Sequence, residues 1–153
     1  MATQYTAGLS AGQILTAATM NQIGATMATY TPAWTGSTTN PVIGNGSISG
    51  QYFQIQKLIV GQIFIVCGST TTYGSGTYRF SVPVAMTGNN TMMSYGQILD
   101  ASAGYVGYTG SGIYLSSTTF EFRTHAAAAF SPTVPVTLAA SDQIRIQFIY
   151  EAS

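Results

Sequence analysis

The chain has 153 residues and a formal net charge of zero, because four lysines and arginines are balanced by four aspartates and glutamates. Charged residues make up only 5% of the sequence, against roughly 25% in an average soluble domain. Hydrophobic residues make up 46%, which argues against intrinsic disorder, since disordered chains combine high charge with low hydrophobicity. Four isolated cations also argue against nucleic-acid binding, which depends on clustered lysines and arginines.

This length predicts one ordinary domain with one core. A neutral domain is poorly protected against association, because solubility usually relies on net charge away from zero. We therefore expect much of the surface to be buried against copies of the chain or against a larger scaffold. The alternative is that hydroxyl and amide side chains alone keep a monomer soluble.

Three features of the sequence bear on where the protein is made: its single cysteine, its N-terminal residues and the length of its apolar stretches. The single cysteine, Cys67, cannot form an intrachain disulfide and lies in the apolar run "LIVGQIFIVC", which favours a buried and inert thiol. The N-terminal residues do not read as a secretion signal, and the apolar stretches are too short to cross a bilayer. We expect synthesis in a cytoplasm and no membrane partner.

Residues 1–28 read differently from the rest of the chain. Ser10 followed by Gln13 matches a capping box, and a short helix is predicted near residues 11–24, where Gly24 would end it. A helix of this length is marginal alone and should pack on its own domain or on a partner. The prediction is an N-terminal segment over 1–28 and a β domain over 29–153.

From Thr29 onward, β-branched and aromatic runs are separated by Gly, Ser, Thr and Asn, which is typical of short strands joined by turns. In "QIRIQFIYE" (143–151) apolar and polar residues alternate, so one face of this strand should be core. "TTFEFRT" and "TYRFSV" repeat the alternation, whereas "KLIVGQIFIVCG" is apolar throughout and should be buried on both faces or lie at a subunit interface. "TGNN" (87–90) and "TGSG" (109–112) are predicted turns. Eight or so short strands predict an all-β, antiparallel, jelly-roll-like β-sandwich.

Catalytic and metal-binding residues are scarce. The only histidine, His125, precedes four alanines and is predicted to be an incidental loop residue. Asp100 and Asp142 follow "GQIL" and "AAS" and are predicted to be turn or strand-end residues rather than an acid and base pair. No spacing of Cys, His and carboxylates matches a zinc site. We therefore predict no enzyme, no metal and no cofactor.

Ten tyrosines leave a binding role open. Tyr105, Tyr108 and Tyr114 lie in a Gly-rich segment, and aromatic side chains of this kind can stack on sugar rings or on a partner protein. The alternative is that tyrosine is present simply because it forms strands well.

Several ordered motifs resemble a β-sandwich module of virion proteins from tailed bacteriophages, especially phages of actinobacteria. They are "YTPAW" (30–34), "NPVIGNG" (40–46), "GSTTTYGSG" (68–76) before "FSVPV" (80–84), and the terminal "DQIRIQFIYE" (142–151). The start, "AGQILTAATMN", looks like an N-terminal segment of phage tail-fibre and accessory virion proteins. The resemblance covers roughly residues 5–84 and 141–153, and 85–140 is a variable middle.

The resemblance implies a non-enzymatic structural protein of the virion, a homotrimeric capsid decoration or short surface fibre (head fibre) made in the host cytoplasm. Its partners would be copies of itself and phage capsid or tail proteins. The N-terminal segment would dock on the virion through Leu9, Gln13, Ile14, Leu15, Met20 and Ile23. The expected core or trimer anchors are Tyr30, Trp34, Phe64, Phe80, Ile146 and Phe148. The alternative is a minor tail protein, a receptor-binding adhesin for host cell-wall glycan that uses the three tyrosines of the middle segment.

Overall fold

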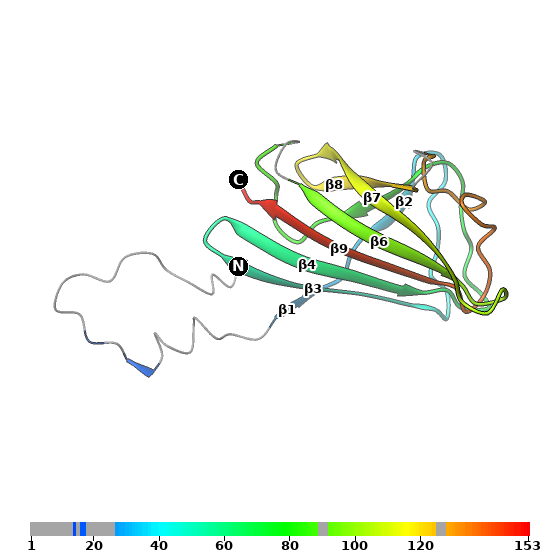
Figure 1. The fold of residues 1–153 in the computed structure, drawn as a ribbon, viewed down its shortest axis with the longest axis horizontal. Coiled ribbons are helices and arrows are strands. Elements are labelled where there is room, and N and C mark those ends of the chain that lie inside the picture. Colours follow the sequence, from blue (N-terminus) through cyan, green and yellow to red (C-terminus); the bar gives the residue numbers. More distant parts are fainter. Residues whose placement is uncertain (1–13, 15, 18–26, 89–91, 125–127) are drawn as a thin grey trace.

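The structure is a computed structural model that describes residues 14, 16–17, 27–88, 92–124 and 128–153. Its nine strands are β1 (Ala28–Tyr30), β2 (Trp34–Gly36), β3 (Ser47–Ile55), β4 (Leu58–Val66), β5 (Tyr78–Ser81), β6 (Met93–Asp100), β7 (Val106–Ser116), β8 (Thr119–Thr124) and β9 (Gln143–Glu151). All nine belong to one antiparallel sheet in the order β1-β3-β4-β9-β6-β7-β8-β5-β2 (Figure 1).

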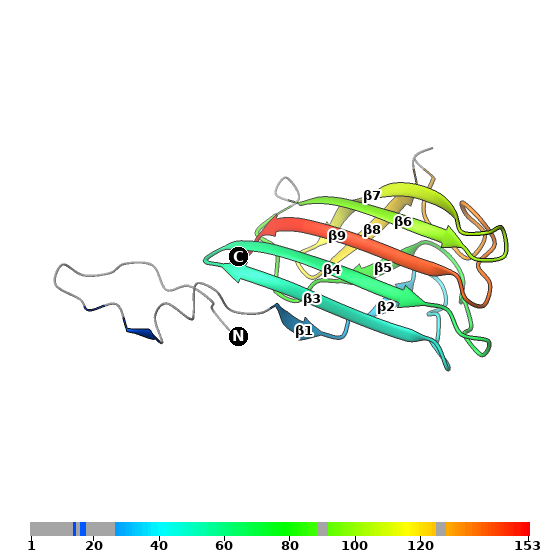
Figure 2. The ribbon, with the colours of Figure 1, turned by 60° about the horizontal axis from the view of Figure 1, so that its bottom comes forward.

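The predicted all-β, antiparallel architecture is confirmed. Two separate sheets are not seen, because strand pairing is continuous from β1 to β2 and the sheet curls on itself instead. Figure 2 shows β3, β4, β9 and β6 in front of β2, β5 and β8. Across the interior, the rings of Phe120 in β8 and Phe148 in β9 lie 6.2 Å apart between centroids, although two strands separate them in the sheet. The predicted helix over 11–24 lies outside the described residues except at 14, 16 and 17.

The two edges of the sheet are joined by three residues. β1 pairs with β3 at one edge and β2 pairs with β5 at the other, and only Thr31, Pro32 and Ala33 connect them. A connection this short spans at most about 14 Å between the flanking Cα atoms, so the edges must lie close together. Pro32 is buried and has no N–H to donate, which ends the pairing with β3. Ala33 then bonds to Ser81, its N–H donating to Oγ at 2.8 Å and its carbonyl accepting from N–H at 3.0 Å.

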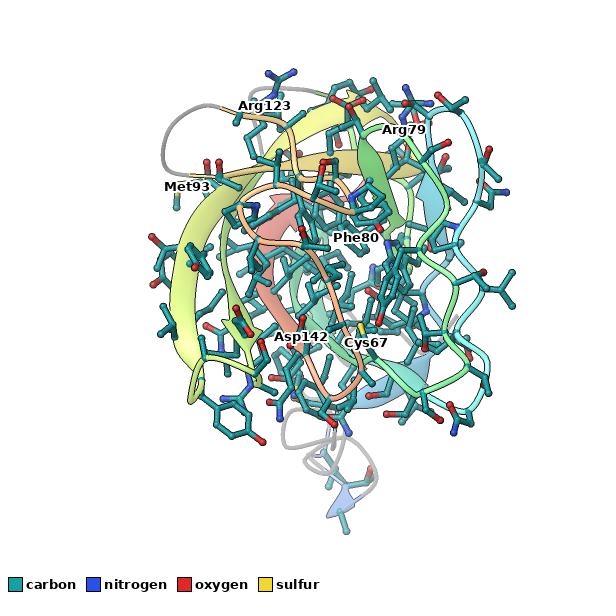
Figure 3. The ribbon with its side chains drawn as sticks, turned by 90° about the vertical axis from the view of Figure 1, so that its right-hand side faces the viewer. Cys67, Arg79, Phe80, Met93, Arg123 and Asp142 are labelled. Carbon is teal, nitrogen blue, oxygen red and sulfur yellow. The ribbon has the colours of Figure 1, made fainter. Side chains whose placement is uncertain are left out.

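The interior of the curled sheet is aromatic. The largest fully buried side chains include Tyr78, Phe80, Phe120, Phe122, Phe130 and Tyr150. Figure 3, viewed roughly along the strands, shows Phe80 among the packed side chains and Arg79 and Arg123 at the periphery. Phe130 comes from the segment between β8 and β9, where its N–H donates to the carbonyl of Phe122 at 3.0 Å. The loop is therefore anchored in the core by one aromatic ring.

The predicted turn at 109–112 is wrong, because these residues lie in the middle of β7. A Cβ at Gly110 would be 2.7 Å from the ring of Phe122, and a Cβ at Gly112 would be 2.9 Å from the ring of Phe120. These glycines leave room for rings of the neighbouring strand to lie flat on the sheet. Gly-rich composition here reflects close packing inside a strand rather than a change of chain direction.

The apolar run of β4 is also not buried on both faces within one chain. Ile59, Ile63 and Ile65 face the core, whereas Leu58, Val60 and Phe64 alternate with them on the exposed side. The outward face of β4 is therefore apolar and exposed. A subunit interface was the other prediction for this run, and an exposed apolar face is compatible with it.

Trp34 closes one side of the core and is 7% exposed, with its ring 5.0 Å from that of Tyr78 in an edge-on arrangement. Trp34→Ala is expected to lower the free energy of unfolding by about 3 kcal/mol or more, as for other buried large aromatics. Trp34→Phe keeps a ring in the site and should lose clearly less. Both are measured by denaturant titration. A loss below about 0.5 kcal/mol for the alanine variant is what a surface residue would give, and would contradict this placement.

Candidate functional site

Two of the motifs behind the family resemblance meet at one side chain. Asn45 follows Gly44, which has a φ of +58° and allows a tight turn here. The Asn45 Oδ1 accepts from the Thr70 N–H at 2.9 Å, and its Nδ2 donates to Ser69 Oγ at 3.0 Å. The Asn45 N–H donates to Thr70 Oγ1 at 2.9 Å. The turn at 40–46 is therefore locked to the turn at 68–76.

Two further motifs, "FSVPV" and "DQIRIQFIYE", also meet. The hydroxyl of Tyr150 donates to the Val84 carbonyl at 2.7 Å, and the Val84 N–H donates back to that hydroxyl at 3.3 Å. Burial raises the pKa of the Tyr150 hydroxyl above its usual range, so it remains protonated and able to donate. The "FSVPV" segment is thus fixed to the last strand of the sheet.

Asp142 is a buried carboxylate that holds three segments together. Its Oδ1 accepts from the Ala101 N–H at 2.9 Å and its Oδ2 from the Ala139 N–H at 2.7 Å. Its carbonyl accepts from the Cys67 N–H at 2.9 Å. Both carboxylate oxygens are therefore occupied by backbone amides, as expected for a carboxylate with a structural role.

Asp100 ends β6 in the same way, its Oδ1 accepting from Ser102 Oγ at 2.7 Å and from the Ala103 N–H at 3.1 Å. His125 lies outside the described residues. Across the described ranges, no three His, Cys, Asp or Glu side chains are grouped as metal ligands would be. In the same ranges, no helix is both long and apolar enough to span a membrane.

The most distinctive surface is formed by the outward side chains of β3, β4, β9 and β6, here called the outer face. Strand register places these side chains in three rows that run across the four strands. The first row is Phe53, Val60, Ile149 and Met93; the second is Gln51, Gln62, Gln147 and Tyr95; the third is Ser49, Phe64, Arg145 and Gln97. Neighbouring strands are about 4.8 Å apart, so each row is roughly 14 Å long.

The first row, with Ile55 and Leu58 beside it, forms an apolar end of the outer face. Val60, Met93, Ile55 and Leu58 are all exposed. Exposed apolar groups that are contiguous, rather than scattered, mark contact surfaces for proteins or ligands. This end of the face is suited to burial against another protein surface.

The second and third rows enclose a shallow cavity of about 540 Å³, here called the amide groove. Gln62 Nε2 donates to Gln51 Oε1 at 3.0 Å, which ties two of its amides together. The Arg145 guanidinium lies 5.5 Å from the centroid of the Phe64 ring and donates to Gln143 Oε1 at 2.6 Å. Arg145 is the only charged side chain in the three rows, so the groove combines amides with two aromatic rings and a single cation.

The predicted site residues are distributed over different parts of the molecule. Trp34, Phe80, Ile146 and Phe148 are buried core residues, Tyr30 packs partly buried against them, and Phe64 lies on the outer face. Of the predicted docking residues Leu9, Gln13, Leu15, Met20 and Ile23 lie outside the described part, and Ile14 is exposed.

The three tyrosines predicted to stack on glycan do not share one surface. Tyr108 and Tyr114 pack against the core, whereas Tyr105 is exposed in the turn before β7 with a φ of +64°. Sequence reasoning missed Tyr95, which is 59% exposed and lies at the edge of the amide groove. Outward Arg145 and Gln147 were visible in the alternation of β9, but the register that puts them beside Gln62 and Tyr95 was not.

No protein-family model, curated protein or solved structure matches the chain.

Cys67 is buried next to Asp142 and Tyr73, and burial, with Asp142 adding to it, raises the pKa of its thiol to about 11. With that pKa, about one thiol in a thousand is ionised at pH 8. Alkylation of the native protein by iodoacetamide at pH 8 should therefore be at least about a hundredfold slower than alkylation of the unfolded chain. Mass spectrometry measures the alkylation rate in native and in denaturing buffer. Equal rates in the two buffers would contradict the burial of Cys67.

The same thiol predicts a pH dependence of stability. Because the folded pKa is above the unfolded value of about 8.5, its contribution is complete below that pH and is lost as pH rises through about 11. The free energy of unfolding should fall between pH 9 and pH 11, and Cys67→Ala should fall less steeply. Denaturant titrations of the wild type and of Cys67→Ala at three pH values give the free energy of unfolding of each. If this free energy falls equally with pH in both proteins, groups other than Cys67 are responsible.

Proposed function

We propose that the protein is a non-enzymatic structural component of a tailed-phage virion, a homotrimer that serves as a capsid decoration or short surface fibre. The resemblance rests on motifs far apart in the sequence. Two pairs of them meet in the fold, one at Asn45 and Thr70 and the other at Tyr150 and Val84. Such contacts support the view that the motifs are the signature of one module rather than chance turns.

The proposal also includes the finer fold of that module. The two halves of the curled sheet face each other across a shared aromatic core, as the sheets of a β-sandwich do. We propose that the curled sheet is a form of the jelly-roll-like sandwich in which one short connection, 31–33, bridges the edges.

The single observation that supports self-association best is the apolar end of the outer face. Four large apolar side chains are exposed there on neighbouring strands. The row of Val60 and Met93 carries no charge, and Glu151 pairs with Leu58 in the next row. A second copy of the chain is the expected occupant, because this end of the face offers few charges to an electrostatic partner, whereas apolar side chains can pack against their own copies. Around a threefold axis, this end of each copy would contact its neighbours.

Purified protein is expected to sediment with a mass three times 16.0 kDa. Val60→Lys should weaken the trimer by at least about tenfold, because a buried unpaired ammonium is costly. Val106→Lys is the matched control, since Val106 is 47% exposed against 40% for Val60 but pairs with Asp100, at the opposite end of β6 from Met93. Sedimentation equilibrium measures the mass in solution of the wild type and of both variants. A monomeric wild type, or equal effects of both variants, would contradict self-association through this end.

Virion attachment is assigned to the N-terminal segment. Deleting residues 1–24 should leave the β-sheet circular-dichroism signal unchanged, because β1 begins at Ala28. The deletion should abolish co-sedimentation with capsids assembled without the protein, to which the full chain binds. Loss of the β signal would make the segment part of the fold, and retained co-sedimentation would place the docking residues elsewhere.

A minor tail or receptor-binding role is the second candidate, and the amide groove is the observation that favours it. The two roles differ in what the isolated protein binds. A decoration protein binds empty capsids and ignores host cells, whereas an adhesin binds cells or their wall glycan. Co-sedimentation with each separates the two.

A further inference from the structure

We propose that the amide groove binds a neutral oligosaccharide chain, with Tyr95 at the centre of the site. This inference concerns a ligand of the folded domain, and it does not depend on trimer formation or on attachment to a virion. The apolar end lies in the neighbouring row of the outer face, and Tyr95 and Gln147 border a hollow together with Val60 and Met93.

The first argument is hydrogen-bonding capacity. The groove is lined by four glutamines, Gln51, Gln62, Gln97 and Gln147. Only the bond from Gln62 to Gln51 joins two of them, and within the described residues the side-chain amides of Gln97 and Gln147 bond to no other protein group. Each primary amide can donate and accept at once, which suits the vicinal hydroxyls of a sugar. Carboxylates, which accept only, are absent from the lining.

The second argument is shape. Beside the groove of about 540 Å³ lies a second hollow of about 370 Å³, which is lined by Thr109, Ser111 and Arg123 among others. Tyr95 borders both hollows, so together they cross the outer side of the sheet from β3 to β8. Two neighbouring hollows on either side of one exposed ring fit an extended chain of sugar units better than a compact ligand.

The third argument is the position of the aromatic rings. Tyr95 is 59% exposed, and Phe64 is held on the opposite side of the groove by the guanidinium of Arg145. Exposed rings on a rigid sheet provide flat apolar surfaces against which the C–H faces of sugars can stack at little entropic cost. Strands also fix the side chains that line the groove more firmly than loops would.

Charge disfavours other polymers. The two hollows contain Arg145 and Arg123, and Arg123 pairs with Glu121 at 3.6 Å. Two cations, one of them already paired, are too few for a nucleic acid, which needs several phosphate contacts. An added peptide strand requires an open sheet edge, whereas the groove lies on the face of the sheet. A polyhydroxylated, uncharged chain matches the groups that remain.

The test uses the full chain and isothermal titration calorimetry with short cello-, chito-, manno- and arabino-oligosaccharides as probes. At least one probe is expected to bind with a dissociation constant below about 1 mM, and binding should persist at high salt because the ligand is uncharged. Absence of binding by all four probes, or loss of binding at high salt, would overturn the proposal.

Matched variants locate the site. Tyr95→Ala should weaken binding about tenfold or more, and Tyr95→Phe should keep most of it because the ring remains. Tyr105→Ala is the control, since Tyr105 is 55% exposed but lies outside both hollows. Gln147→Ala should weaken binding several-fold through lost hydrogen bonds. An equal loss in Tyr105→Ala, or no loss in Tyr95→Ala, would place the ligand elsewhere.

The variants also keep this inference separate from the virion role. Sedimentation of Gln97→Ala, which removes an amide of the groove, should match the wild type, because Gln97 lies in the third row and outside the hollow that Val60 and Met93 line. Oligosaccharide binding by a monomeric wild type would support the groove while contradicting the trimer. A trimeric wild type that binds no probe would support the trimer while contradicting the proposed ligand of the groove.

Discussion

The whole fold depends on the short connection between β1 and β2. Two strands that are neighbours in sequence form opposite edges of a nine-stranded sheet, so the sheet must curl until those edges meet. Curling creates an enclosed interior, and aromatic side chains fill it. Pro32 and the paired bonds between Ala33 and Ser81 fix the geometry of the crossing. Three residues of "YTPAW" thus have a role in the connection between the two edges. Tyr30 ends one edge strand, Pro32 interrupts pairing, and Trp34 starts the other edge strand with its ring in the core.

The remaining motifs serve the same closure. Asn45 ties two loops together at one end of the sheet, Tyr150 ties the "FSVPV" segment to β9, and Asp142 joins the ends of β4 and β6 through backbone amides. None of these contacts lies on the outer face. Closure of the sheet and contact with partners therefore involve different residues. The motifs hold the sheet closed, while the apolar end and the amide groove face outward.

Local patterns predicted the strands well and the surface poorly, for a physical reason. Alternation along β8 and β9 identified Phe120, Phe122, Ile144 and Ile146 as inward residues, because side-chain direction in a strand follows from the sequence itself. The segment "TGSG" was misread because glycine is equally common in turns and beneath packed rings, and only the partner strand distinguishes the two. The amide groove was missed because its side chains come from four strands spread between residues 49 and 147. Their proximity is set by register, which no single segment encodes.

The central position of β9 has a consequence for how the chain is made. Strand β9 pairs with β4 on one side and β6 on the other, yet it comes last among the nine described strands. During synthesis the sheet cannot be completed until residue 151 has left the ribosome. Until then β4 displays its apolar face and an unpaired edge, a state that favours aggregation and gives a slow, long-range final step. Pairing of β9 is therefore the step that covers the edge of β4 and joins it to β6.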